Sequence, residues 1–201
     1  MRKLVVVLVL LTALLPVAAI ALPTTEAMLA ERAMGNPQAK VTIVEYSSLT
    51  CPHCAEFHRD VLPQIKAAYI DTGMVRWVFR DFPLDGRAMG AAMVARCVPP
   101  DRYFGFLDML FRDQQAWARG TDPLADLKVR AQLAGLAPAD VDACLADKAL
   151  LQGIQTRAQE AQKQDGVDST PSFRLNGQKI APNHTFPEFQ AAIDQALAAA
   201  K

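Results

Sequence analysis

The stretch that decides the fold is VTIVEYSSLTCPHCAEFH, residues 41–58. Its first part, Val41–Tyr46, is apolar and rich in β-branched residues, which predicts a buried strand. The part that follows Cys51 lacks glycine, and Pro52 has the fixed φ angle that suits the first turn of a helix. A strand therefore leads into a helix here, and Cys51 is placed at the helix N-terminus.

The position of Cys51 predicts an acidic thiol. The unpaired backbone N–H groups and the positive end of the helix dipole at this terminus favour an anion. A thiolate on Cys51 gains from both, and His53 adds to the effect if it is protonated or donates a hydrogen bond. Cys54 follows one helical turn later, where it can resolve a disulfide made by Cys51. We expect an exposed Cys51 of low pKa and a redox role for the pair.

A metal site is the alternative for a lone CxxC motif. The other two cysteines, Cys97 and Cys144, are isolated, and the sequence has no second CxxC and no HxxxH to complete the usual zinc pattern. His53 and His58 could supply imidazole, but His53 lies between the two thiols, which makes simultaneous binding awkward. We therefore predict redox chemistry at Cys51 and Cys54, with no metal and no cofactor.

A second, distant motif gives the pattern a family resemblance. Residues 166–173 read GVDSTPSF. Together with the strand, the CPHC motif and a Glu six residues before Cys51, this resembles the DsbA-like thiol–disulfide oxidoreductases of the thioredoxin superfamily. The resemblance covers residues from about Val41 to the C-terminus. It implies an α/β, thioredoxin-like fold with a helical insertion domain.

The resemblance also implies roles for three further residues. Thr170 and Pro171 are expected to face the active disulfide, with Pro171 in the cis form and the Thr170 backbone free to pair with an extended substrate chain. Glu45 would be a buried acid that moves protons to or from Cys54. An unpaired charge in an apolar strand is costly, so Glu45 is either an exposed strand residue or has a cationic partner, for which Arg76 and Arg80 are candidates.

The chain is expected to have five parts. Residues 1–21 resemble a secretory signal peptide, with Arg2 and Lys3 before an apolar run and cleavage predicted after Ala21; an uncleaved membrane anchor is the alternative. The remaining parts are an N-terminal tether over 22–40, the first half of the thioredoxin-like domain over 41–84, a helical insertion over 85–165, and the second half over 166–201.

Patterns within these parts predict individual elements. The tether has one helical possibility around Glu26–Met34. Apolar residues at helical spacing follow the CPHC motif, with Pro63 expected to kink or divide the helix. A strand is predicted over Val75–Phe82, parallel to the first one. The second half contains a hairpin around Asn176-Gly177 and a final helix from about Phe186.

Cys97 and Cys144 each fall on a predicted helix of the insertion. In an exported protein the expected state is a structural disulfide, with two buried thiols as the alternative. Similar second disulfides in some DsbA-like proteins favour the same pairing. His58 and His184 are expected at the surface.

Charge and compartment limit the function. Without residues 1–21 the chain has 180 residues, with 21 acidic and 19 basic side chains, which gives no support to nucleic-acid binding. The resemblance implies a periplasmic dithiol oxidase that acts on reduced or unfolded exported proteins and is recycled by a quinone-linked membrane oxidase. The short segment before Val41 favours a monomer. The alternatives are a reductase or isomerase of the same fold, or a copper- or zinc-binding module.

Overall fold

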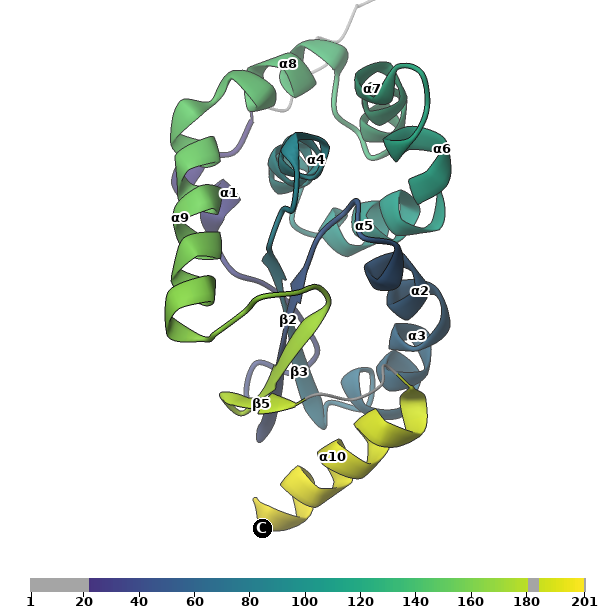
Figure 1. Cartoon of the computed structure of the whole chain (residues 1–201), viewed down its shortest axis with the longest axis vertical. Coiled ribbons are helices and arrows are strands. Elements are labelled where there is room, and N and C mark those ends of the chain that lie inside the picture. Colours follow the sequence, from purple (N-terminus) through teal and green to yellow (C-terminus); the bar gives the residue numbers. More distant parts are fainter. Residues whose placement is uncertain (1–21, 181–184, 201) are drawn as a thin grey trace, which may run out of the picture.

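The computed structural model describes residues 22–180 and 185–200, and the expected signal peptide and His184 lie outside them. The described chain forms a five-stranded sheet in the order β1-β3-β2-β4-β5 (Figure 1). Its strands are β1 (Arg32–Met34), β2 (Val41–Ser47), β3 (Val75–Asp81), β4 (Ser172–Leu175) and β5 (Gln178–Ile180).

The centre of the sheet is the predicted pair of parallel strands. β2 and β3 are paired from Val41 opposite Val75 to Ser47 opposite Asp81. The connection between them consists of α2 (Pro52–Asp60), α3 (Leu62–Ile65) and a π-helical turn over Lys66–Ile70. The division between α2 and α3 falls at Val61, just before the Leu62–Pro63 pair, as the proline predicts. Phe57 and Ile65 pack this connection against Ile43 and Trp77 of the sheet.

The chain between β3 and β4 is helical; its first helices lie beyond one end of the sheet, and the last one, α9 (Lys148–Gln164), runs down beside the sheet (Figure 1). The helices before it are α4 (Gly86–Cys97), α5 (Tyr103–Arg112), α6 (Gln114–Ala118), α7 (Pro123–Leu133) and α8 (Pro138–Ala146). Breaks occur at three places rich in proline or glycine, at Pro99-Pro100, from Gly120 to Pro123 and from Gly135 to Pro138, and two more lie at Asp113 and Asp147. Asp147 starts α9 by accepting hydrogen bonds from the N–H groups of Ala149 and Leu150.

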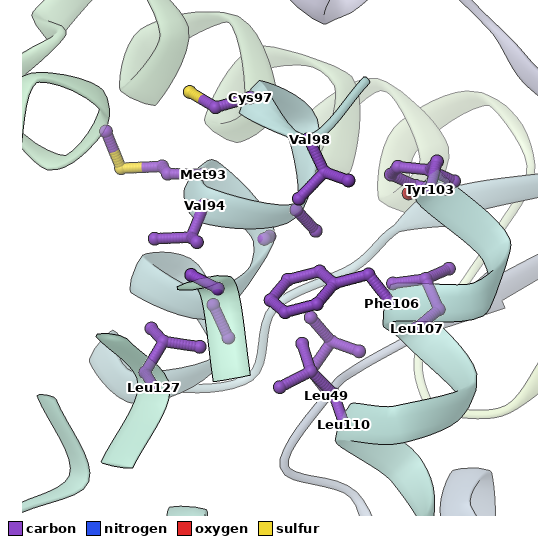
Figure 2. Close-up of a cluster of buried hydrophobic side chains, with 14 of the residues drawn as sticks. Leu49, Met93, Val94, Cys97, Val98, Tyr103, Phe106, Leu107, Leu110 and Leu127 are labelled. Atoms are coloured by element: carbon purple, nitrogen blue, oxygen red, sulfur yellow. The ribbon is translucent and has the colours of Figure 1, made fainter. Parts of the chain in front are cut away.

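The insertion has a hydrophobic core of its own (Figure 2). Phe106, Leu107 and Leu110 of α5 and Met93 and Val94 of α4 belong to this core. Leu49 comes from the loop between β2 and α2, yet its side chain lies in the same cluster and is 2% exposed. The insertion is therefore packed directly against the loop that leads to Cys51.

The second half of the sheet follows α9. β4 pairs antiparallel with β2, and β5 pairs antiparallel with β4. The two-residue turn between them is Asn176-Gly177, with φ values of 46° and 82°, which are the positive angles that such a turn requires. The last helix, α10 (Phe186–Ala199), inserts Phe189 and Ile193 beside Phe57 and Trp77.

The N-terminal segment differs from the prediction. The expected helix around Glu26–Met34 is only α1 (Thr25–Leu29), and residues Arg32–Met34 form β1, which pairs antiparallel with β3. The helical prediction is wrong beyond Leu29 because the open edge of β3 offers backbone hydrogen bonds that sequence periodicity does not reveal. Within residues 22–180 and 185–200, every helix is too short or too polar to span a bilayer.

Candidate active site

The two cysteines of the CPHC motif lie where strand β2 and its loop end and helix α2 begins. Cys51 is the N-cap residue, with an extended backbone (φ −77°, ψ 121°), and Pro52 occupies the first helical position. The Cys51 carbonyl accepts a hydrogen bond from the Ala55 N–H at 3.2 Å. Both sulfurs are unpaired thiols. Cys51 is 7% exposed and Cys54 fully buried, so the expectation of an exposed Cys51 is wrong: the proline loop and the insertion cover it.

The environment of Cys51 favours the thiolate. Its pKa falls from the ordinary 9.0 to about 5, chiefly because the Cys54 thiol donates to its sulfur. Burial opposes the shift, while the Thr170 hydroxyl and the backbone N–H groups of Cys54 and His53 add to it. These N–H groups are the free donors of the helix N-terminus, so the predicted physical cause is present.

Cys54 has the opposite tendency. Burial raises its pKa well above the ordinary value, and the neighbouring Cys51 thiolate raises it further. The Ser47 hydroxyl and the Ser48 backbone lower it only in part. One cysteine of the pair is therefore a good leaving group as a thiolate, and the other holds its proton.

The GVDSTPSF loop packs against this pair. Pairing of β2 with β4 places Tyr46 opposite Ser172, so the residues just before β4 lie next to the end of β2. The Thr170–Pro171 peptide bond is cis. In the protonated form, the Cys51 thiol donates to the Thr170 carbonyl oxygen, 3.3 Å away. The Thr170 hydroxyl is buried without a geometrically defined partner, which leaves it free to donate to the thiolate.

Glu45 is fully buried, and its partners are neither Arg76 nor Arg80. Its carboxylate oxygens lie 2.8 Å from His58 Nε2 and 3.1 Å from Trp77 Nε1. The two proposed arginines face away from it.

Arg76 pairs with Glu31, and Arg80 contacts the Tyr46 hydroxyl at 3.0 Å. Both arginines alternate with Val75, Trp77 and Phe79 along β3 and so lie on the opposite face of the sheet from Glu45.

His58 is the residue that the sequence prediction misplaced. It is buried, not at the surface, and its ring stacks on Phe111 of α5 with centroids 4.0 Å apart. Helix α2 is covered by the sheet on one side and by the insertion on the other, which leaves no solvent-facing side at this position. An available signal was the spacing: His58 lies four residues after Cys54, on the same helical face.

His53, unlike His58, lies at the surface. Its side chain is 74% exposed, and Nδ1 lies 3.2 Å from Glu56 Oε2. Its contribution to the low pKa of Cys51 comes through the backbone N–H. In the part of the chain that the structure describes, no cluster of three or more His, Cys, Asp or Glu side chains is arranged to hold a metal ion.

Cys97 and Cys144 form a disulfide that joins α4 to α8. Both residues are 1% exposed, and Cys97 Sγ lies 3.5 Å from the Met28 sulfur. The bond closes a long loop within the insertion, with a sequence separation of 47 residues. It joins two helices of the insertion and is buried, which fits a structural role.

Removal of this disulfide is expected to destabilise the protein. A Cys97→Ser/Cys144→Ser variant should lose about 2–4 kcal/mol in free energy of unfolding, since the closed loop restricts the unfolded chain. Denaturant titration of both proteins measures the loss, and the CPHC thiols serve as an internal control because their reactivity should be retained. An equally stable variant would contradict a structural role.

A buried pair of thiols with opposite proton affinities, set at a helix N-terminus and covered by a cis-proline loop, defines a thiol–disulfide oxidoreductase of thioredoxin-like fold. The comparisons with known proteins agree. The family model described as "Thioredoxin" matches residues 28–195. The crystal structure of Wolbachia pipientis alpha-DsbA1 superposes with a TM-score of 0.79 and 31% identity, covering 89% of this chain and 98% of that one.

Curated relatives have related names. A Rickettsia bellii protein named "Putative protein-disulfide oxidoreductase" is 31% identical over 169 residues, which is 84% of this chain and 65% of that protein. Disulfide bond formation protein D of Bacillus subtilis is 25% identical over 172 residues, 82% of this chain and 76% of that one. The chain thus spans less than two thirds of the Rickettsia relative's length. It belongs to the thioredoxin family and is similar to DsbA proteins, which confirms the predicted fold class and family resemblance.

Proposed function

We propose that the protein is a periplasmic dithiol oxidase that introduces disulfides into exported proteins through a Cys51–Cys54 redox disulfide. A substrate thiolate attacks Cys51 Sγ, the Cys51–Cys54 bond breaks, and Cys54 leaves and takes up a proton. A second substrate thiolate then attacks the substrate sulfur of the mixed disulfide, and Cys51 leaves as a thiolate. The substrate loses two electrons, and the enzyme pair gains them.

The observation that carries this proposal is the asymmetry of the two thiols. A pKa of about 5 at Cys51 makes it the better leaving group in the second step, since low-pKa thiolates leave faster. The same stabilisation favours the reduced enzyme over the oxidised one, which is the property of an oxidant. The raised pKa of Cys54 favours its protonation once it has left in the first step.

Three further roles belong to the same proposal. Thr170 and Pro171 would bind the substrate backbone next to the reacting sulfur by strand pairing. Glu45 would move protons toward Cys54. Glu45 and Ser47 lie on the same face of β2, and this face meets His58 and Cys54 of α2. Residues 1–21 would direct export of the chain. A quinone-linked membrane oxidase would reoxidise the cysteine pair, and the protein would act as a monomer.

The reduction potential tests the direction of electron flow. Glutathione equilibration of the Cys97→Ser/Cys144→Ser variant reports on Cys51–Cys54 alone, once its folding has been checked. We expect a value around −120 mV, typical of a strong disulfide donor. A value near −270 mV, as in thioredoxin, would overturn the oxidase proposal and favour a reductase.

The isomerase alternative has a separate readout. An isomerase would rearrange scrambled disulfides in a model substrate, and a reductase would reduce them. An oxidase instead forms new disulfides in a reduced substrate. Stoichiometric zinc or copper held by the reduced protein against a chelator would instead favour the metal-binding alternative.

A further inference from the structure

Gln114 links the helical insertion to the active-site loop. It is the first residue of α6 and is 4% exposed. Its side-chain Nε2 donates to two backbone carbonyl oxygens, that of Leu49 at 2.9 Å and that of Cys51 at 3.0 Å. Both hydrogens of the amide are used, and both hydrogen bonds are buried. One side chain from the insertion therefore spans the turn that leads into helix α2.

The two carbonyls differ in what they lose without Gln114. Leu49 lies outside any helix or strand, its side chain is fixed in the core of the insertion (Figure 2), and Gln114 is the donor that its carbonyl has. The Cys51 carbonyl would keep the Ala55 N–H and lose one of its two donors. A buried carbonyl that loses its donor turns toward another one, because an unpaired buried acceptor costs about 1–3 kcal/mol.

The orientation of these peptide groups acts directly on the Cys51 sulfur. The Cys54 thiol contributes most to the low pKa of Cys51, and the backbone N–H groups of Cys54 and His53 add to it. Both the Cys54 side chain and these N–H groups belong to the first turn of α2, so their contributions depend on the geometry of that turn. The Cys51 carbonyl is part of that turn, since it also accepts from the Ala55 N–H. Rotation of the Cys51 or Leu49 carbonyl would misdirect the donors or bring a negative dipole toward the sulfur.

A second contact between the loop and the insertion is much weaker. The Thr50 hydroxyl donates to Asp85 Oδ2 at 2.8 Å, but this pair is exposed to solvent. Asp85 also caps α4 by accepting from the Ala88 N–H at 2.7 Å. Solvent can replace the Thr50 contact, whereas the buried position of Gln114 admits no such replacement.

We propose that Gln114 is a positioning residue for the redox reaction: by holding the Leu49 and Cys51 carbonyls it maintains the helix N-terminus that stabilises the Cys51 thiolate. The inference rests on the proposed function of Cys51 and adds a residue from the insertion to its machinery. The insertion thereby contributes to the redox properties of the cysteine pair as well as to the core.

The test compares Gln114→Met with the wild type and with Gln115→Met. Methionine has nearly the same length and shape as glutamine but no donor, and the exposed neighbour Gln115 provides a matched control on the same helix. In Gln114→Met we expect the acid dissociation constant of Cys51, followed by thiolate absorbance, to fall about tenfold. The glutathione equilibrium should shift about tenfold toward the oxidised enzyme, which corresponds to about 30 mV. Gln115→Met should change neither.

The outcomes separate this inference from the proposed function. A Gln114→Met protein that is less stable but keeps the wild-type Cys51 pKa and glutathione equilibrium would overturn the positioning role, whereas an ordinary thiol pKa in the wild type would overturn the proposed function itself. If Gln114→Met does not fold, Gln114→Asn carries the test. Its amide is one methylene shorter and cannot reach both carbonyls, so the Cys51 pKa should still rise, and an unchanged value would overturn the inference.

Discussion

The reduced protein should become more stable relative to a Cys51→Ser variant as the pH rises. The folded-state pKa of Cys51 is about 5, against 9.0 for an ordinary thiol. A tenfold change in acid dissociation constant corresponds to about 1.4 kcal/mol. The thiolate thus stabilises the folded, reduced protein by several kcal/mol above the ordinary thiol pKa, by less near neutral pH, and hardly at all below the folded pKa.

The sign of this dependence follows from the depressed pKa. Above the unfolded value both states are ionised, and the full stabilisation is present; as the pH falls, the unfolded thiol takes up its proton first and the folded thiolate only near pH 5. Denaturant titrations of reduced wild type and Cys51→Ser from about pH 4 to about pH 8 measure the difference. The Cys97–Cys144 pair must be in the same redox state in both proteins. A difference that does not vary with pH would mean that Cys51 is an ordinary thiol.

Sequence reasoning located the active site because its signals are local. A β-branched strand followed by CPHC fixes a helix N-terminus, and it places the Cys54 thiol and two backbone N–H groups next to Cys51; only the Thr170 contribution comes from a distant segment. The Asn176-Gly177 turn and the break near Pro63 are likewise decided by the conformations of single residues. Each of these features was predicted and lies at its predicted place in the structure.

The features that were missed depend on contacts between distant segments. The sequence left Glu45 either exposed or paired with a cation, and the choice of His58 over the arginines depends on which face of β3 meets α2. The role of Gln114 depends on α6 being packed against residues 49–51, more than 60 positions earlier in the chain. The edge strand β1 exists only because β3 has an open side. Tertiary packing decides all three.

The buried pair of Glu45 and His58 should be worth more to stability than any exposed pair in the protein. Glu45→Leu removes the carboxylate and leaves two buried donors, His58 Nε2 and Trp77 Nε1, without their acceptor. We expect a loss of about 3–5 kcal/mol in free energy of unfolding, the range for breaking a buried pair from one side. His58→Leu should also destabilise, since the buried carboxylate then keeps only the Trp77 donor.

A double-mutant cycle isolates the interaction, and the chain offers a matched control. His53 and Glu56 of helix α2 form a second His–Glu pair, but their side chains are 74% and 57% exposed. The coupling between Glu45 and His58 should exceed about 1 kcal/mol, because residues in one hydrogen-bonded network are not additive, whereas the exposed pair should couple by less than about 0.5 kcal/mol. Equal coupling energies in the two cycles would show that burial adds nothing to the Glu45–His58 contact.

The milder Glu45→Gln substitution separates stability from proton transfer. Glutamine keeps the shape and one acceptor but cannot exchange a proton at neutral pH. If Glu45 serves Cys54 as proposed, this variant should remain folded and form the mixed disulfide more slowly, with an altered pH profile, because Cys54 must take up a proton as it leaves. Stopped-flow measurement of disulfide reduction by a small thiol follows this step. A folded variant with the wild-type rate and pH profile would restrict Glu45 to a structural role.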